Sequence, residues 1–329
     1  MQFRCKQCGR TYPLNGLQYK CDCNGLFQLA KEPGDKIADL ISLGEVKTPI
    51  IVSAIDEIDV HLKLDYMAPT GSFKDRGARV LISQLKAIGI KEVVEDSSGN
   101  AGASIAGYCA AAGIRCHIYV PESTSLGKTK QISAYQSDLI RVPGSRDDTA
   151  IAVQRAAEQV YYASHVYNPL FFEGTKSIAA EIEADIGIPD YVVVPAGNGT
   201  MLLGVYYGFL ELGRLPRLIA VQSAACSPVY TRYHGLEPMA VSGTIAEGIA
   251  VQCPARIDEM VEAIRNSGGD IITVTDEEVQ DAWSLLAGRG IYVEPTASVA
   301  VAGMRNYFSI RKGPFGKIVV PLTGTGLKK

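Results

Sequence analysis

The sequence predicts an α/β protein with parallel sheets, because short apolar segments alternate with helical segments along most of the chain. Apolar runs of about four or five residues are typical of strands that are covered on both faces. The expected strands are 91–95, 115–120, 138–142, 191–195, 217–221, 270–274 and 317–321. The expected helices include 101–112, 147–162, 175–186 and 276–288, and acidic residues at 276–278 favour a helix start there.

Length and composition narrow the class of protein. A chain of 329 residues can bury a large core and form more than one domain. The formal net charge of −3 gives no basic bias of the kind that nucleic-acid-binding proteins carry. No apolar run approaches the roughly 20 residues that span a bilayer, and the N-terminus lacks the apolar core of a signal peptide. We therefore expect a cytoplasmic protein with no membrane or nucleic-acid partner.

Residues 1–30 look like a separate small knuckle. Cys5 and Cys8 are followed by Cys21 and Cys23, and four thiolates can complete a tetrahedral zinc shell. Because one residue rather than two separates the second pair, a ribbon without metal and two local disulfides stay open as alternatives. The knuckle is locally basic, so a nucleic-acid-binding or other non-catalytic module is also kept as an alternative. The remaining four cysteines lie in apolar segments, as core residues do.

The stretch from Pro69 to Gly77 sets Lys74 in a short turn between a strand-like segment at 60–64 and a helix-like one at 78–88. Gly71 and Gly77 permit close backbone approach there. A lysine held in this way can form a Schiff base with an aldehyde cofactor if the pKa of its amine is lowered. The alternative is a solvated Lys-Asp-Arg run at a helix start.

Three further turns offer binding groups. Residues 192–201 run from a strand through a Gly-rich turn into a helix, where backbone N–H groups can bind an anion. This turn lacks both nucleotide-binding glycine patterns, so a single phosphate fits it. Residues 96–102 offer two hydroxyls and an amide, which suit a carboxylate and a cofactor hydroxyl, or plain N-capping by Ser98 or Asn100. Thr323, after the last strand, can present a neutral hydroxyl or lie in a flexible C-terminal turn.

Together these four segments resemble the fold-type II family of pyridoxal-phosphate enzymes over roughly residues 45–329. The lysine stretch, the segment 293–298 and the closing segment 323–328 are most similar to those of threonine synthases, many of which also carry an N-terminal cysteine knuckle. The resemblance implies a homodimer with two domains in each chain. The larger, cofactor-binding domain would comprise 31–74 and 166–329, and the smaller, mobile domain would comprise 75–165.

The resemblance also implies roles for individual residues. Lys74 would carry the cofactor as a Schiff base, Phe73 would stack near its ring, Asn100 would bind the ring hydroxyl and Thr323 would face the ring nitrogen. The phosphate would be held by Gly197, Asn198, Gly199, Thr200 and Met201. The substrate carboxylate would be lined by Ser97, Ser98 and Ala101.

The implied reaction is that of threonine synthase, which converts O-phosphohomoserine and water to threonine and phosphate. By resemblance, the candidates for the substrate-phosphate site are Lys63, Ser98, Ser145, Arg146 and Asn168. The chain departs from the family pattern at Ser145, where an asparagine is expected. Arg146 can compensate for that change, but a solvated arginine near a helix start is the favoured interpretation. Residues 243–251 look more like threonine and serine dehydratases. A dehydratase (ammonia-lyase) and a β-replacing amino-acid synthase therefore stay open as alternatives.

Overall fold

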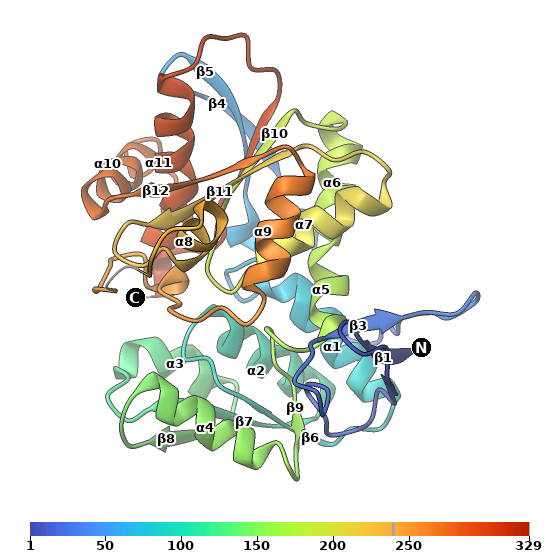
Figure 1. The fold of residues 1–329 in the computed structure, drawn as a ribbon. Coiled ribbons are helices and arrows are strands. Elements are labelled where there is room, and N and C mark those ends of the chain that lie inside the picture. Colours follow the sequence, from blue (N-terminus) through green and yellow to red (C-terminus); the bar gives the residue numbers. More distant parts are fainter. Residues whose placement is uncertain (239–240, 329) are drawn as a thin grey trace. The chain divides into compact units, whose positions relative to one another are not determined.

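The computed structural model describes residues 1–238 and 241–328, and in it the chain divides into two compact units (Figure 1). The first unit contains Met1–Glu45, Lys74–Gly174 and the C-terminal end from Lys328, and the second contains Val46–Phe73 and Thr175–Leu327. Each unit has its own sheet and its own helices. The predicted α/β fold is confirmed.

The second unit is built on a six-stranded sheet with the order β12-β11-β10-β13-β5-β4. Its strands are β4 (Ile50–Ile55), β5 (Ile58–Lys63), β10 (Tyr191–Pro195), β11 (Arg217–Ser223), β12 (Asp270–Val274) and β13 (Ile318–Pro321). All neighbours are parallel except the β4–β5 hairpin at the edge. The central strand β10 is buried along Val192–Pro195, which is why its sequence is apolar on both faces.

Helices cover this sheet and form its core. They are α6 (Ser177–Ile186), α7 (Thr200–Glu211), α8 (Pro228–His234), α9 (Ile257–Asn266), α10 (Asp276–Ala287) and α11 (Pro295–Ser309), with short 3₁₀ turns at Asp65–Met67, Glu247–Ile249 and Gly326–Lys328. α10 begins with a capping box between Thr275 and Glu278, as the acidic first turn predicts. α11 packs so closely on β11 that a Cβ at Gly303 would lie 2.4 Å from a methyl carbon of Val221.

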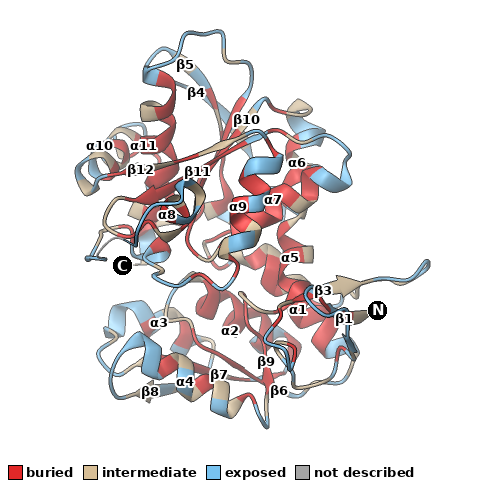
Figure 2. Cartoon of the chain, in the orientation of Figure 1, coloured by how far each residue is buried: buried red, intermediate tan, exposed pale blue. Residues whose placement is uncertain are grey.

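The first unit has a parallel four-stranded sheet with the order β8-β7-β6-β9. Its strands are β6 (Glu92–Glu95), β7 (Arg115–Pro121), β8 (Asp138–Val142) and β9 (Tyr161–Tyr162). Its helices are α1 (Lys74–Ala87), α2 (Asn100–Ala112), α3 (Leu126–Ala134) and α4 (Arg146–Ala156), and α5 (Pro169–Thr175) ends at the unit boundary. α2 is buried over most of its length, as Figure 2 shows.

Two local predictions in this unit were wrong. The helix expected at 147–162 ends at Ala156, because Tyr161 and Tyr162 form β9 and pair with Val93 and Val94 of β6. Lys74 was expected in a turn before a helix at 78–88. It is instead the first residue of α1. The turn that contains Gly71 ends at Phe73, and the helix begins with the next residue.

The N-terminal residues form a three-stranded antiparallel sheet of β1 (Gln2–Cys5), β2 (Thr11–Tyr12) and β3 (Phe27–Ala30). Its Phe3 and Phe27 belong to the same hydrophobic core as α1 and α2. The following segment is tied to α1 as well, since the backbone N–H of Ile41 donates to Ser83 Oγ at 3.0 Å. The first unit thus extends beyond the residues 75–165 expected for the smaller domain, and the mobility of that domain stays a prediction.

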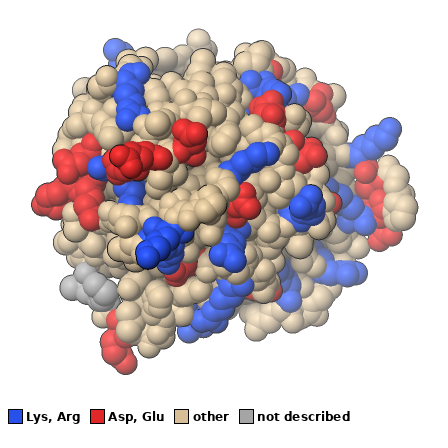
Figure 3. All heavy atoms as spheres, turned by 90° about the horizontal axis from the view of Figure 1, so that it is seen from above, with Lys and Arg blue, Asp and Glu red and all other residues tan. Residues whose placement is uncertain are grey.

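On the face drawn in Figure 3, lysine and arginine side chains alternate with aspartate and glutamate side chains. None of the helices in the described part of the chain has the length and apolarity needed to cross a bilayer.

Candidate active site

Lys74 begins α1 beside an aromatic ring. Its Nζ lies 5.8 Å from the centroid of the Phe171 ring. The ring approaches the helix this closely because residue 77 is glycine, and a Cβ there would lie 2.3 Å from the ring carbons. The next residue, Asp75, is buried and accepts a hydrogen bond of 2.6 Å from Ser104 Oγ of α2. The start of α1, and with it the lysine, is therefore held by packing and by a buried hydrogen bond.

A buried carboxyl–imidazole pair also contacts the Phe171 ring. His165 packs edge-on against that ring, with centroids 6.0 Å apart, and its Nδ1 lies 2.6 Å from Glu95 Oε1. Burial and the nearby Asp96 charge raise the pKa of Glu95 well above its ordinary value. Burial and the charge of Lys74 lower the pKa of His165 well below its ordinary value. Both shifts favour the uncharged forms of the two side chains.

The turn at 96–102 connects β6 to α2. Gly99 is the N-cap of α2, and within the described chain no side chain caps the helix there, so neither Ser98 nor Asn100 serves as the cap. The turn is compact because residue 102 is glycine, where a Cβ would lie 1.8 Å from the Ser97 carbonyl oxygen. Uncapped N–H groups at a helix start favour an anion such as a carboxylate. Asn100, the first residue of α2, accepts a hydrogen bond of 2.9 Å from Lys328 Nζ.

Asp96, the first residue of this turn, is held by two hydrogen bonds. Its two oxygens accept hydrogen bonds of 2.6 Å from Arg146 Nη2 and 2.5 Å from the Tyr162 hydroxyl. Sequence reasoning missed the roles of Asp96, Tyr162, Glu95 and His165. The one available signal was the pair of acidic residues at the end of an apolar strand, since buried carboxyl groups need partners.

In the second unit, the Gly-rich turn joins β10 to α7. Gly199 is the N-cap of α7 with a φ of +82°, a conformation that favours glycine, and a Cβ there would also lie 2.6 Å from Met260 Sδ. Gly197 is equally constrained, since its Cβ would lie 2.9 Å from the Ile249 Cα. Backbone N–H groups at a helix start can bind an anion. Of the other predicted residues, Asn198 lies in this turn, and Thr200 and Met201 are the first residues of α7.

Thr323 follows β13 and is buried, yet its hydroxyl has no hydrogen-bond partner among the described residues. Its carbonyl oxygen accepts a hydrogen bond of 3.0 Å from the backbone N–H of Phe73. The neighbouring hydroxyl of Ser72 is likewise buried without a partner in the described chain. Because an unpaired buried hydroxyl is costly, this arrangement fits a bound group that presents a hydrogen-bonding atom to Thr323.

Four of the five predicted substrate-phosphate ligands have partners within their own unit. Lys63 is fully buried and donates to the Thr48 carbonyl and to Glu181, both at 2.6 Å. Ser145 caps α4, Arg146 binds Asp96, and Asn168 donates to the Tyr161 hydroxyl at 2.9 Å. These contacts favour structural roles, and binding of a substrate phosphate by these residues stays a prediction.

The four N-terminal cysteines come together. All four Sγ atoms lie within 4.8 Å of one another, with Cys5–Cys23 at 3.6 Å and Cys8–Cys21 at 3.5 Å. These separations exceed a disulfide bond of about 2.05 Å and are close to the roughly 3.8 Å edge of a tetrahedral zinc–thiolate shell. A hydrogen bond from Tyr12 lowers the pKa of Cys21 to about 6, toward the thiolate that metals bind.

Glycine and backbone groups complete this cluster. A Cβ on Gly25 would lie 2.5 Å from Cys5 Sγ, so only glycine leaves room for the sulfur. The backbone N–H groups of Gln7 and Cys8 both donate to the Cys5 sulfur at 3.4 Å. Such donors stabilise a thiolate, and the donor set fits a single zinc ion.

Comparisons with known proteins identify the family of the chain. The family model described as "Pyridoxal-phosphate dependent enzyme" matches residues 41–324. The threonine synthase of Methanocaldococcus jannaschii is 31% identical over 375 residues, covering 99% of this chain and 92% of that protein. The threonine synthase of a Synechocystis strain is 34% identical over 328 residues, covering 94% and 84%.

Solved structures show the same fold at lower identity. Maize serine racemase superposes with a TM-score of 0.77 at 21% identity, covering 85% of this chain and 88% of that one. Threonine deaminase from Solanum lycopersicum superposes with a TM-score of 0.76 at 19% identity, covering 90% and 89%. The predicted fold-type II resemblance is thus confirmed, and the chain belongs to the family of pyridoxal-phosphate-dependent enzymes.

Proposed function

We propose that this enzyme is a threonine synthase, which converts O-phosphohomoserine and water to threonine and phosphate. The observation that carries the proposal is the extent of similarity to curated threonine synthases. The match to the M. jannaschii protein covers 99% of the chain and so includes the cysteine segment, which lies outside the family match at 41–324.

The residues present fit pyridoxal phosphate. Lys74 would bind its aldehyde carbon, and Thr323, whose buried hydroxyl has no partner in the described chain, would bind the ring nitrogen. Phe73 would lie beside the ring, and Asn100 would bind the ring hydroxyl. The phosphate would be bound by residues Gly197 to Met201, which form the Gly-rich turn and the start of α7. When bound, this cofactor withdraws electrons from the α-carbon of the amino acid.

The residues of the chain then have distinct tasks. The Lys74 amine would accept and return a proton at the substrate α-carbon. The uncapped start of α2, with Ser97, Ser98 and Ala101, would bind the substrate carboxylate. The neutral Thr323 hydroxyl would leave the ring nitrogen largely unprotonated, which suits elimination and replacement reactions.

A second candidate function is favoured by the internal contacts of the predicted phosphate ligands. Lys63, Arg146 and Asn168 already have hydrogen-bonding partners, so their side chains are occupied by structural contacts. This observation supports a dehydratase (ammonia-lyase) or a β-replacing synthase, neither of which requires those residues as substrate-phosphate ligands.

The test is to incubate the cofactor-loaded enzyme separately with O-phosphohomoserine, L-threonine, L-serine, and O-acetyl-L-serine with sulfide or sulfite. Threonine and phosphate from the first establish a threonine synthase. Ammonia and a 2-oxo acid from threonine or serine establish the dehydratase, and a sulfur-containing amino acid establishes β-replacement. The Lys74→Ala variant is the control, since it should lose turnover of every substrate.

We also infer three finer properties. The four clustered sulfurs support one structural zinc ion in each chain, which metal analysis of purified protein would test. Family resemblance supports a homodimer, which light scattering would test. The free thiols favour a location in the reducing cytoplasm, which fractionation of cells would test.

A further inference from the structure

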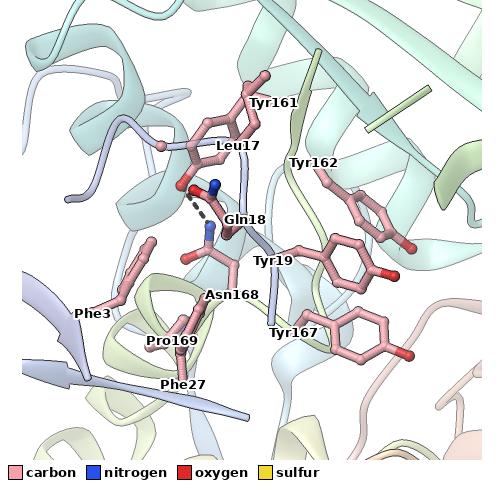
Figure 4. Close-up of a pocket in the computed structure, with 11 residues that line it drawn as sticks. Phe3, Leu17, Gln18, Tyr19, Phe27, Tyr161, Tyr162, Tyr167, Asn168 and Pro169 are labelled. Atoms are coloured by element: carbon pink, nitrogen blue, oxygen red, sulfur yellow. Dashed lines mark hydrogen bonds between the residues drawn. The ribbon is translucent and has the colours of Figure 1, made fainter. Parts of the chain in front are cut away.

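Three tyrosines connect the cysteine segment to the sheet of the first unit. Tyr19 lies two positions before Cys21, and its ring meets those of Tyr162 and Tyr167 at centroid distances of 5.4 and 5.1 Å. Both contacts are edge-to-face, a geometry that aromatic pairs prefer. Figure 4 shows these rings in the seam between the cysteine segment and the segment that contains β9.

Tyr162 continues this connection to the turn before α2. Its hydroxyl donates to Asp96 Oδ1 at 2.5 Å, and the two residues are only 4% and 6% exposed. Asp96 immediately precedes Ser97, the first hydroxyl of the turn. Because the bond is buried, a displaced Tyr162 would leave an unpaired polar group and disturb the turn.

The position of Tyr19 depends in turn on the cysteines. Residues 13–26, all of them described, form neither helix nor strand between β2 and β3. The loop is closed where Cys21 and Cys23 meet Cys5 and Cys8. A tetrahedral ion would tie two points of this loop, Cys21 and Cys23, to Cys5 and Cys8 outside it. Four sulfurs without an ion have only weak mutual attraction.

We propose that metal binding at the four cysteines positions the Asp96–Asn100 turn through Tyr19 and Tyr162. Loss of the metal would release Tyr19, loosen the turn and weaken binding of the amino-acid substrate. Both tyrosines are positioning residues, since they act through Asp96. The effect on substrate binding rests on the proposed function, but the mechanical coupling does not.

The first experiment measures hydrogen exchange in the full-length, cofactor-loaded protein with zinc, after chelation and after zinc is restored. We expect backbone amides at 97–103 to exchange about three- to tenfold faster without metal and to recover with zinc. Strand β8, which lies at the far edge of the same sheet, should not change and serves as the internal reference. Unchanged exchange at 97–103 would overturn the proposal, as would failure of the protein to bind zinc.

Variants separate the tyrosine path from general damage to the fold. With zinc bound, Tyr19→Ala should reproduce the faster exchange at 97–103, while Tyr19→Phe keeps the ring and should restore the wild-type rate. Tyr162→Phe keeps all three rings but removes the bond to Asp96, so it too should exchange faster. Tyr167→Phe is the matched control, because it removes a hydroxyl from the same cluster and leaves that bond intact.

Kinetics complete the test. In Tyr19→Ala and Tyr162→Phe, KM for the amino-acid substrate should rise about three- to tenfold, with kcat changed less than about twofold. Equal falls of kcat in all four variants, with KM unchanged, would overturn the proposal. If exchange responds as expected but no amino acid is turned over, the coupling is supported and the proposed function fails.

Discussion

Glu95 and His165 form a buried, hydrogen-bonded pair, with Glu95 Oε1 2.6 Å from His165 Nδ1 and both side chains removed from solvent. Burial disfavours charge on either group, which raises the pKa of the acid and lowers that of the base. His165 and the Lys74 amine both contact the Phe171 ring, at 6.0 and 5.8 Å from its centroid. Burial therefore favours uncharged forms of both side chains next to the ring that Lys74 contacts.

The raised pKa of Glu95 predicts a dependence of stability on pH. In the unfolded chain this carboxyl loses its proton near its ordinary pKa of 4.5, while the folded chain keeps it to higher pH. Folding thus takes up a proton in that window, and Glu95 makes the free energy of unfolding fall as pH rises, by at most about 1.4 kcal/mol per pH unit.

Glu95→Gln removes that proton uptake, so its stability relative to wild type should increase from pH 5 to pH 8, as measured by urea unfolding. The control is Glu92→Gln on the same strand. The hydrogen bond with His117 lowers the pKa of Glu92, so this variant should lose stability relative to wild type as pH rises through about 4.5. Parallel pH profiles for Glu95→Gln and wild type would contradict the raised pKa of Glu95.

Gly77→Ala should destabilise the first unit. The added methyl would lie 2.3 Å from the Phe171 ring, and overpacking of this kind costs about 1–3 kcal/mol. The matched control is Gly127→Ala in α3, where nothing lies within 4 Å and alanine should stabilise the helix by about 0.5–1 kcal/mol. Urea unfolding measures both, and equal stability of the two variants would show that Phe171 moves freely.

Lys63→Met should act mainly on stability. The Lys63 amine is fully buried against Glu181, and removal of one partner of a buried pair costs about 3–5 kcal/mol. Lys47→Met is the matched control, since Lys47 pairs with Asp185, which lies in α6 as Glu181 does. Lys47 is exposed, and exposed pairs contribute about 0–1 kcal/mol. A stable Lys63→Met variant with a raised KM for O-phosphohomoserine would instead support a role as substrate ligand.

Thr323→Val should weaken cofactor binding without destabilising the apoprotein. The hydroxyl has no partner in the described chain, so its replacement by a methyl of the same shape should leave the free energy of unfolding unchanged or slightly raised. Loss of its bond to the cofactor should raise the Kd about five- to tenfold. Fluorescence titration with pyridoxal phosphate measures this, with Thr325→Val in the same turn as the control; equal Kd values would reject the assignment of Thr323.

The sequence by itself determined the α/β class, the apolar strands and the local shape of the turns. Val192 to Val194 are buried on both faces, and such strands must be apolar whatever lies beside them. Gly199 with its positive φ follows from backbone sterics, which are also local. The spacing of the four cysteines likewise predicts that they cluster.

Only the tertiary structure decided which polar residues form hydrogen bonds or ion pairs with other residues of the chain. Tyr162 was expected at a helix end, yet it lies in β9 and donates to Asp96, 66 positions away in the sequence. Lys63 has its partner Glu181 at a separation of 118 positions, and neither contact has a periodic or local signal. Hydrophobic pattern and turn chemistry act over a few residues, whereas partners of buried charges are selected by chain packing, which brings together residues from distant segments.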